Sequence, residues 1–281
     1  MTEKTLNNRK NGMVVLLLLV LAYVASVVLF IFGVSYDILP LTLISCVWFV
    51  FGWIFFLGLK VLKPQEALVL TLFGKYVGTL KNSGFYFVNP FCTAVNPAAG
   101  TKLNQSGDVK VLGAKQPSGG ADVSVDIPTK KISHKIMTLN NNRQKINDCL
   151  GNPVEIGIAV MWRVVDTAKA VFNVDNYKEY LSLQCDSALR NIVRIYPYDI
   201  APNVDTTGDG IADEGSLRGS SEVVAARIKD EIQDKVSEAG IEILEARITY
   251  LAYAPEIAAV MLQRQQASAI IDARKMIVDG A

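Results

Sequence analysis

The sequence predicts an α+β domain behind a membrane-embedded helical hairpin, with an extended helix at the C-terminal end. Three observations predict this fold class. From Met13 to Leu59 the only charged residue is Asp37, whereas the rest of the chain has the composition of a globular protein. After residue 60 the apolar residues recur first with the period of strands, then with that of helices, then again with that of a strand. From Pro255 onward, a helical segment rich in Ala, Gln and Arg shows no C-terminal cap.

The apolar stretch divides into two runs, Met13–Val34 and Ile38–Leu59, each 22 residues long. A helix of that length measures about 33 Å, against about 30 Å for the hydrocarbon core of a bilayer. Residues Ser35–Pro40 between the runs suit a turn, because Asp37 is costly at the bilayer centre and proline fits a first helical turn. Two alternative interpretations do not match these runs. A secretory signal peptide has a shorter apolar region and is not followed at once by a second long one. A pair of buried core helices would need polar faces, and these runs have none.

Basic residues flank this hairpin and are absent from its turn. Lys4, Arg9 and Lys10 precede the first run, and Lys60 and Lys63 follow the second. The positive-inside rule therefore predicts that both ends of the hairpin, and the domain that follows, are cytoplasmic at the cell membrane. A full crossing and a shallower wedge into one leaflet both fit this orientation, and the sequence does not separate them.

We expect four segments along the chain: a cytoplasmic tail at 1–12, the hairpin at 13–59, the α+β domain at 60–254 and an oligomerisation helix at 255–281. The domain is expected to begin with three short strands at Glu66–Phe73, Tyr76–Leu80 and Phe85–Val88. The strongest strand signal is Val154–Arg163, whose alternating apolar residues predict one face toward a core. We expect one polar strand before it, at 132–146. A last strand is expected where every second residue is apolar or aromatic, at Leu244, Ala246, Ile248 and Tyr250.

Three helices are expected between these last two strands. Asp166 is the N-cap of a short helix through Phe172, and a longer helix runs from Asp175 to before Pro197. Ser221–Ala239 carries apolar residues on one face and is stopped by Gly240. The stretch Cys92–Lys131 is expected to be a long insertion with one strand at Val123–Ile127.

Short motifs recur in order along residues 60–270. They are Val61–Ala67, Phe73–Leu80, Gly84–Phe85, Gly151–Ile156, Trp162–Ala170, Ser187–Arg190, Tyr196–Asp199, Gly240–Ile248, Ala252–Ile257 and Met261–Ala267. The ordered set resembles the stomatin–prohibitin–flotillin (SPFH), or band 7, family. The hairpin in front of it is similar to that of the stomatin branch.

The resemblance implies an SPFH/band 7 domain, an antiparallel sheet with packed helices. It further implies a membrane-associated scaffold that forms homo-oligomers, organises a membrane patch, and binds or restrains other membrane proteins, including membrane-bound proteases. It implies no catalytic residue, no cofactor and no metal in this domain. The insertion at Cys92–Lys131 and the Gly/Asp-rich loop at Asn203–Ser220 depart from the family pattern.

The stretch Asp205–Glu214 is the one segment of the sequence that resembles a metal loop. Asp205, Thr207 and Asp209 take the first, third and fifth positions of a calcium loop, but Ser216 stands where the closing glutamate belongs. We interpret the stretch as a solvated acidic turn, and calcium binding stays open as the alternative.

Other reactive residue types are scattered along the chain. His134 is flanked by lysines, which is typical of a solvated strand face, and Glu242, Glu245 and Arg247 are interpreted as the outward face of a strand. Four cysteines without metal or redox spacing are interpreted as reduced thiols: Cys46, Cys92, Cys149 and Cys185. A net charge of +1 with alternating signs excludes a typical nucleic-acid binder.

We therefore expect a scaffold and not an enzyme, held by a hairpin anchor and assembled through the α+β domain and the helix after Pro255. Its partners are the lipid bilayer, further copies of itself, and membrane proteins. Two alternatives stay open. One is a monomeric adaptor that recruits one enzyme to the membrane. The other is an enzyme or transporter, against which stand the missing nucleophile, metal and phosphate motifs and the small number of spans.

Overall fold

The computed structural model describes residues 2–6, 11–101, 103, 130–141, 143–199 and 215–279, which form two compact units. Among these residues, unit 1 contains 2–100, 130–135 and 164–177, and unit 2 contains the rest. The residues 60–254 that were expected as one domain are thus divided between the two units. The expected strand at Val123–Ile127 and the calcium-like stretch at Asp205–Glu214 lie outside the described residues.

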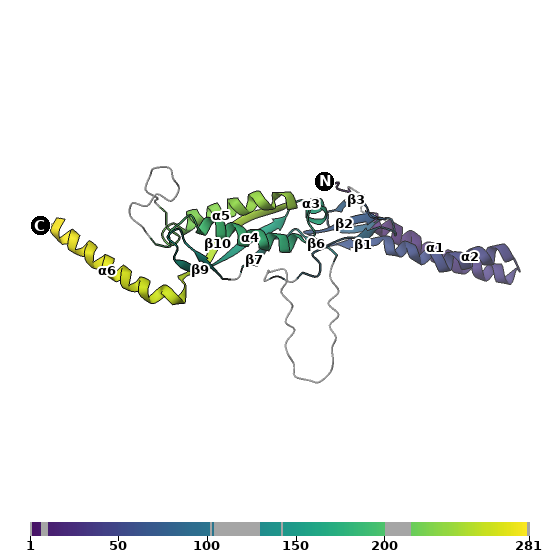
Figure 1. The fold of residues 1–281 in the computed structure, drawn as a ribbon. Helices are drawn as coiled ribbons and strands as arrows, with labels where there is room; N and C mark the ends of the chain where they lie inside the picture. Colours follow the sequence, from purple (N-terminus) through teal and green to yellow (C-terminus); the bar gives the residue numbers. More distant parts are fainter. Residues whose placement is uncertain are drawn as a thin grey trace, which may run out of the picture. The chain divides into compact units, whose positions relative to one another are not determined.

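Unit 1 begins with the helical hairpin predicted from the apolar runs (Figure 1). Helix α1 spans Gly12–Ser35, helix α2 spans Leu39–Phe51, and a 3-10 segment, η1, continues α2 over Gly52–Gly58. Pro40 lies in the first turn of α2, where its missing N–H costs nothing. Asp37, in the turn between the helices, adopts a left-handed backbone with φ 52°. The hairpin is confirmed, with bounds that differ from the prediction by one or two residues.

Six short strands complete unit 1 together with one short helix. The strands are β1 Leu59–Leu62, β2 Glu66–Leu72, β3 Lys75–Leu80, β4 Gly84–Phe87, β5 Thr93–Ala94 and β6 Ile132–Ser133. Strand β2 pairs antiparallel with β3, β5 and β6, and β1 pairs antiparallel with β4. Helix α3, Thr167–Phe172, is capped as predicted, because the Asp166 carboxylate accepts a hydrogen bond from the Lys169 N–H at 3.0 Å.

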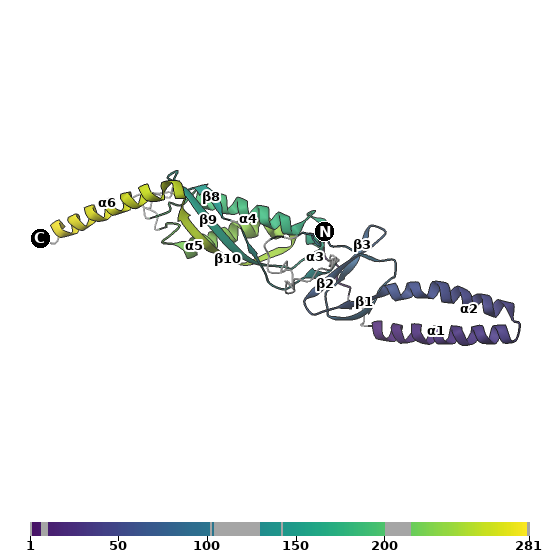
Figure 2. The ribbon, with the colours of Figure 1, turned by 90° about the horizontal axis from the view of Figure 1, so that it is seen from below.

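Unit 2 is a sheet with helices on one face. Its strands are β7 Met137–Asn140, β8 Gln144–Asn147, β9 Pro153–Val164 and β10 Ile241–Tyr253, and its helices are α4 Tyr177–Val193, α5 Ser221–Val236 with a 3-10 turn at Ser237–Ala239, and α6 Pro255–Asp279. Strand β9 lies at the centre, between β10 on one side and β7 and β8 on the other (Figure 2). Gly240, with φ 66°, ends the α5 segment as predicted.

The alternation in β9 has the predicted consequence. The five side chains expected to point inward are fully buried, and Val164 continues the same alternation; the five are Val154, Ile156, Ile158, Val160 and Trp162. The buried stripes of α4 and α5 pack over that face. The opposite face carries polar contacts, among them the Arg163–Glu242 ion pair at 2.6 Å and the Arg143 guanidinium 3.7 Å from the centre of the Tyr250 ring. The core of unit 2 therefore lies between one face of the sheet and the two helices.

One strand prediction was wrong, and one strand begins earlier than expected. The single strand expected at 132–146 is divided, because β6 pairs with β2 in unit 1 while β7 and β8 pair with β9 in unit 2. The pairing register shifts by one residue between Leu139↔Val160 and Ile146↔Val154, so a bulge separates β7 from β8. The expected last strand is present as β10, which begins three residues before Leu244; of the four residues expected to alternate, Ala246 is buried and the other three are half-buried.

Helix α5 offers a direct test of the unit 2 core. Ile232 is fully buried, whereas Val223 on the same helix is 56% exposed. We expect Ile232→Ala to lower the free energy of unfolding by about 2–5 kcal/mol, because it removes buried methylenes and leaves a cavity. Urea unfolding of the detergent-solubilised chain, followed by circular dichroism, measures the loss. Val223→Ala is the matched control and should change the value by about 0.5 kcal/mol or less; equal effects of the two substitutions would contradict this core.

Candidate membrane anchor and assembly helix

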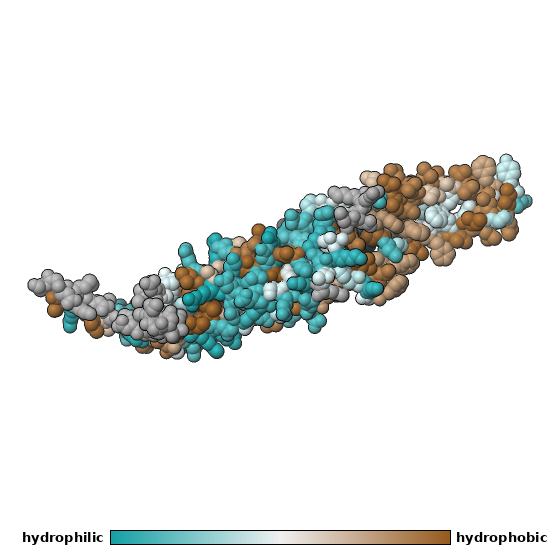
Figure 3. All heavy atoms as spheres, turned by 90° about the horizontal axis from the view of Figure 1, so that it is seen from above, coloured by the Kyte–Doolittle hydropathy of each residue, from teal (hydrophilic) through white to brown (hydrophobic). Residues whose placement is uncertain are grey.

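The outer surface of the hairpin is apolar along both of its helices. Residues Gly12–Ser35 and Leu39–Gly58 are long and apolar enough to cross a membrane, and only 11% and 17% of their most apolar windows are buried. Large side chains such as Leu17, Leu21 and Ile44 are each about two-thirds exposed. Figure 3 shows apolar residues gathered over the hairpin and polar residues over most of the remaining face. Core helices of a soluble protein are mostly buried, whereas these two helices are not, which is consistent with a membrane hairpin.

Small residues set the contact between the two helices. The buried residues of α1 recur every seven positions, at Gly12, Leu19, Ser26 and Gly33. A side chain at Gly33 would place its Cβ 2.7 Å from the Cγ2 atom of Thr42, closer than two carbon atoms can lie. Gly33 therefore allows the close approach of α1 and α2 near their connecting turn.

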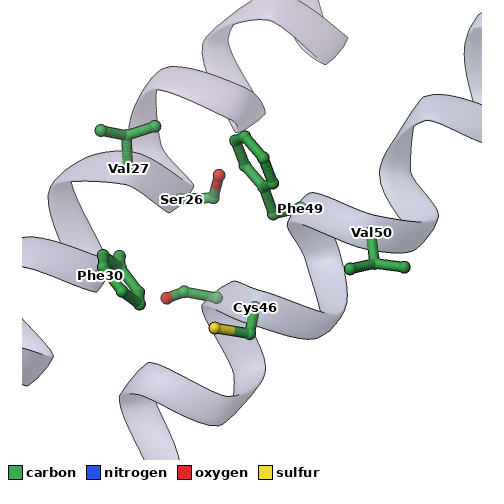
Figure 4. A pocket seen from close by; sticks show the side chains of 7 residues that line it. Ser26, Val27, Phe30, Cys46, Phe49 and Val50 are labelled. Atoms are coloured by element: carbon green, nitrogen blue, oxygen red, sulfur yellow. The ribbon is translucent and has the colours of Figure 1, made fainter.

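Three hydroxyl groups of the hairpin are bonded within their own helices, whereas the buried Tyr23 hydroxyl has no hydrogen-bond partner among the described residues. Ser26 donates to the Tyr23 carbonyl at 2.8 Å, Thr42 to the Leu39 carbonyl at 2.7 Å, and Ser45 to the Leu41 carbonyl at 2.9 Å. A shallow cavity of about 280 Å³ lies beside Ser26 and Ser45, between the helices (Figure 4). Its other lining residues are Val27, Phe30, Cys46, Phe49 and Val50. Because both hydroxyls are already bonded, this cavity presents an apolar surface to whatever fills it.

The tail before the hairpin is part of the same folded unit as the strands after it. Thr5 forms a parallel bridge with Thr79 of β3. The Thr79 N–H donates to the Lys4 carbonyl at 2.9 Å, and the Leu6 N–H donates to the Thr79 carbonyl at 3.0 Å. The Leu6 side chain packs against the apolar core of unit 1. The tail thus adds a short strand to the edge of β3.

The Glu3 carboxylate holds this tail strand in place. Its Oε2 atom lies 2.6 Å from the Lys81 Nζ atom, and its Oε1 atom accepts hydrogen bonds from the N–H and the hydroxyl of Thr167 at 3.3 and 2.5 Å. Thr167 is fully buried, and the Glu3 side chain is only 13% exposed. Lys81 also donates to the Val165 carbonyl at 3.0 Å. Glu3 therefore links the tail to β3 and to the start of α3 through charge-assisted hydrogen bonds.

Both ends of the hairpin abut β4 and the residues beside it. A Cβ at Gly12 would lie 2.7 Å from the Phe85 carbonyl carbon, and one at Gly58 would lie 2.4 Å from the Val88 carbonyl oxygen. The Val88 N–H donates to the Gly58 carbonyl at 2.9 Å. The first residue of α1 and the last of η1 therefore both contact the segment 84–88.

The C-terminal helix α6 is anchored at its base to unit 2. Just before the helix, the Ala254 N–H donates to the Pro153 carbonyl at 2.9 Å, and the rings of Tyr198 and Tyr253 have their centres 3.9 Å apart. Within the helix, the Glu256 Oε1 atom lies 2.5 Å from the Lys145 Nζ atom. One turn or more further on, the Gln265 Nε2 atom donates to the Asp199 Oδ2 atom at 2.8 Å. Burial of its ring, together with the Asp199 and Asp148 carboxylates, raises the pKa of Tyr253 to about 12, so this tyrosine is neutral at physiological pH. The direction in which α6 leaves the sheet is thereby defined.

Beyond its base, α6 exposes large apolar side chains. These are Val260, Leu262, Ile270, Ile271, Ile277 and Val278, all more than half exposed. Ile270 and Ile277 lie seven residues apart, as do Ile271 and Val278, which is the spacing of a helix-to-helix seam. A surface of this kind is typical of a helix that pairs with another helix.

The residues that sequence analysis considered as possible reactive groups do not come together in one site among the described residues. Glu242 forms an ion pair with Arg163, and Glu245 with Arg247, both at the surface as expected. His134 differs from its prediction, since it is half-buried and its Nδ1 atom lies 2.6 Å from the Val164 carbonyl oxygen. None of the four cysteines forms a disulfide. Burial raises the pKa of the Cys185 thiol to about 12, which makes it unreactive. Within the described ranges, three or more metal-binding side chains do not cluster anywhere.

The contacts of the N-terminal tail were missed by sequence analysis. One signal for them was present, since Gly78 interrupts the predicted strand that became β3. A Cβ at that position would lie 2.9 Å from the Lys4 carbonyl oxygen and 2.6 Å from the Leu6 Cγ atom. A glycine inside a strand often marks a close backbone approach, although it does not tell which segment approaches.

Comparison with known proteins supports the resemblance drawn from the motifs. A family model described as "SPFH domain / Band 7 family" matches residues 60–277. The match starts at the hairpin end of β1 and extends almost to the end of α6. A comparison with curated proteins found no match.

The Glu3 contacts predict how firmly the tail is held. We expect Glu3→Ala to accelerate trypsin cleavage after Lys4 about tenfold or more, because losing hydrogen bonds to a charged group costs about 1.5–3 kcal/mol and opens the tail more often. Timed proteolysis of the full chain in detergent micelles measures this rate. Thr2→Ala, an exposed neighbour, is the control and should leave the rate unchanged. A tail that is cleaved equally fast in all three proteins would contradict the docking of the tail on β3.

Proposed function

Because the chain belongs to the SPFH/band 7 family, we propose that it is a membrane-anchored scaffold that assembles into homo-oligomers and organises a patch of membrane. In this role it binds or restrains other membrane proteins, including membrane-bound proteases. The observation that carries the proposal is the hairpin of two apolar helices whose flanking segments fold together in unit 1. A protein of this design presents a folded unit at the membrane surface.

Membrane insertion of the hairpin is supported by its energetics. Helix α1 contains sixteen Leu, Ile, Val and Phe residues. Each contributes about 0.3–0.6 kcal/mol at the centre of a membrane helix, so α1 alone supplies on the order of 5–10 kcal/mol. At 24 residues, α1 is about 36 Å long, enough for a full crossing of the hydrocarbon core.

The tail strand supports a topology with both ends of the hairpin on one side. Residues 2–6 pair with β3, which follows the hairpin in the chain, so the two flanks have to meet in water on the same face of the bilayer. Lys4, Arg9 and Lys10 precede the hairpin, Lys60 and Lys63 follow it, and Asp37 in its turn is the only charged residue between Lys10 and Lys60. We therefore propose that the tail strand and the strands of unit 1 that follow the hairpin lie on the cytoplasmic side. A spanning hairpin and a wedge both meet this requirement.

Assembly in this proposal works through avidity. Each anchored chain diffuses in two dimensions, so weak contacts between chains act at a high effective concentration. The exposed apolar seam of α6 supplies one such contact. The prominent features of the described residues are two apolar surfaces, the hairpin and the seam of α6. These surfaces support a scaffold, so we propose a scaffold and not an enzyme.

Removing the hairpin alone tests the role of the anchor. Gly12 and Gly58 both abut the segment 84–88, so a short Gly-Ser linker can replace residues 12–58 while keeping the tail strand and β1. We expect the variant to be soluble without detergent and to lose most of its assembly, because the chains are no longer concentrated in a plane. Light scattering coupled to size-exclusion chromatography measures the mass. A large assembly that survives the replacement would count against avidity, and a full-length chain that is monomeric in mild detergent would favour a monomeric adaptor.

A second variant tests the α6 seam. We expect Ile270→Asp combined with Ile277→Asp to reduce the mass of the detergent-extracted particle severalfold, because two buried charges would face the neighbouring helix. Ala258→Asp introduces a charge at an exposed position on the opposite side of the same helix and should leave the mass unchanged. If the wild type and both variants have equal masses, α6 does not contribute to the assembly contacts.

A further inference from the structure

The two legs of the hairpin have different lengths but are held together at both ends. Helix α1 has 24 residues, whereas α2 and η1, which together form the second leg, have 20. Near the turn, Gly33 lies against Thr42. At the base, Gly12 and Gly58 both abut the segment 84–88. The legs run side by side between these contacts (Figure 2), so the second leg covers nearly the same distance as α1 with fewer residues.

A stretched backbone makes up much of this difference. The η1 segment is a 3-10 helix of seven residues, whereas such runs seldom exceed about three or four residues. A 3-10 helix rises about 2.0 Å per residue, against about 1.5 Å for an α-helix. The second leg therefore measures about 33.5 Å, whereas an α-helix of the same 20 residues would measure about 30 Å. The 3-10 backbone brings it closer to the length of α1, which is about 36 Å.

The spacing of small residues in the second leg fits this change of helix type. Its buried residues are Ser45, Gly52 and Gly58. The first interval is seven residues, about two turns of an α-helix, and the second is six residues, about two turns of a 3-10 helix. In a continuous α-helix, Gly58 would be turned by about 120° away from the line of the other two. The change at Gly52 thus keeps the three residues on one side of the leg.

Gly52 forms the joint between the two helix types. Its φ of −61° and ψ of −27° are typical of a 3-10 helix. A Cβ at this position would lie 3.1 Å from the Tyr23 hydroxyl oxygen and 3.3 Å from the Trp48 Nε1 atom. Both polar atoms are buried without a hydrogen-bond partner among the described residues. Neither side chain therefore fixes the backbone of the joint through a hydrogen bond in this structure.

We propose that η1 is an extensible segment whose helix type follows the thickness of the bilayer. The inference rests on the proposed membrane anchor, with the hairpin spanning the bilayer. Hydrogen bonds in a 3-10 helix have poorer geometry than those in an α-helix, so the required length is what keeps η1 stretched. In a thin bilayer the stretched leg would push apolar side chains such as Phe55 and Leu57 out of the hydrocarbon core. Conversion of η1 to an α-helix shortens the leg by about 3.5 Å and removes this mismatch.

The same conversion acts on the base of the hairpin. In the stretched form, the Val88 N–H donates to the Gly58 carbonyl at 2.9 Å. Conversion to an α-helix draws Gly58 toward the membrane and turns its carbonyl, so this hydrogen bond is lost. Membrane thickness is thereby coupled to the contact between the hairpin and the segment that follows β4. A membrane patch of matching thickness stabilises the docked form.

Spin-label distances measure the length of the second leg. Ile44→Cys combined with Leu57→Cys places labels at two exposed positions on either side of the joint, in a background without Cys46 and Cys149. The full chain is reconstituted in dimyristoleoyl, dioleoyl and dierucoyl phosphatidylcholine, which form bilayers of increasing thickness, and distances are read by double electron–electron resonance. We expect the distance to be about 3 Å shorter in the thinnest bilayer than in the thickest. Tilting of the hairpin, the other response to mismatch, leaves this distance unchanged.

A pair of labels on the other leg is the matched control. Leu17→Cys combined with Phe30→Cys has the same separation in sequence within α1, and its distance should be the same in all three bilayers. Insertion of two leucines after Phe55 gives the second leg enough residues to reach about 33 Å as an α-helix. We expect this insertion to abolish the thickness dependence of the distance between residues 44 and 57.

The outcomes separate this inference from the proposed function. An unchanged distance between residues 44 and 57, or an equal change in the α1 pair, overturns the extensible segment while the membrane scaffold stands. A thickness dependence that persists after the insertion overturns it as well. A chain that does not float with the lipid vesicles contradicts the proposed anchor, and the inference falls with it.

Discussion

The apolar surface of the hairpin sets the constraint on which the rest of the structure depends. The most apolar windows of these two helices are only 11% and 17% buried, so the surface that they expose suits a lipid environment. The hydroxyl groups of Ser26 and Ser45 are bonded within their own helices, and Gly33 lets the two helices lie close together. The Tyr23 hydroxyl and the Trp48 indole N–H are buried without a partner among the described residues. The helical backbone is satisfied by its own hydrogen bonds, which is the requirement for a segment inside a bilayer.

The segments before and after the hairpin fold together, so both ends of the hairpin are attached to one folded unit. The tail strand docks on β3 through Glu3, and the ends of the helices contact the segment 84–88. A force on the folded unit is thus shared by both ends of the hairpin. Unit 2 contributes a different property, because α6 exposes a seam of large apolar side chains. In the proposed function, unit 1 holds the membrane segment and unit 2 offers a surface for assembly.

Much of this architecture could be predicted from the sequence where one local pattern decides the outcome. The apolar runs predicted α1 and α2, the alternation from Val154 predicted β9, and the cap at Asp166 predicted α3. The predictions were wrong where pairing partners decide the outcome, as for residues 132–146, which are shared between two sheets. The Glu3 contacts could not be predicted, because they join residues 78 and 164 positions apart and depend on the folded geometry. Edge strands likewise become visible only once the strand order is known.

The most direct test of the anchor is the side of the membrane on which its two flanks lie. Thr2→Cys and Lys63→Cys place a thiol before and after the hairpin, and Asp37→Cys places one in its turn, each in a background that lacks the exposed Cys46. Labelling of sealed membrane vesicles with an impermeant maleimide then reports the side of each thiol. Our account predicts that residues 2 and 63 are labelled from the cytoplasmic side, with residue 37 labelled from the other side for a span or from neither side for a wedge. Labelling of residues 2 and 63 from opposite sides would contradict the account.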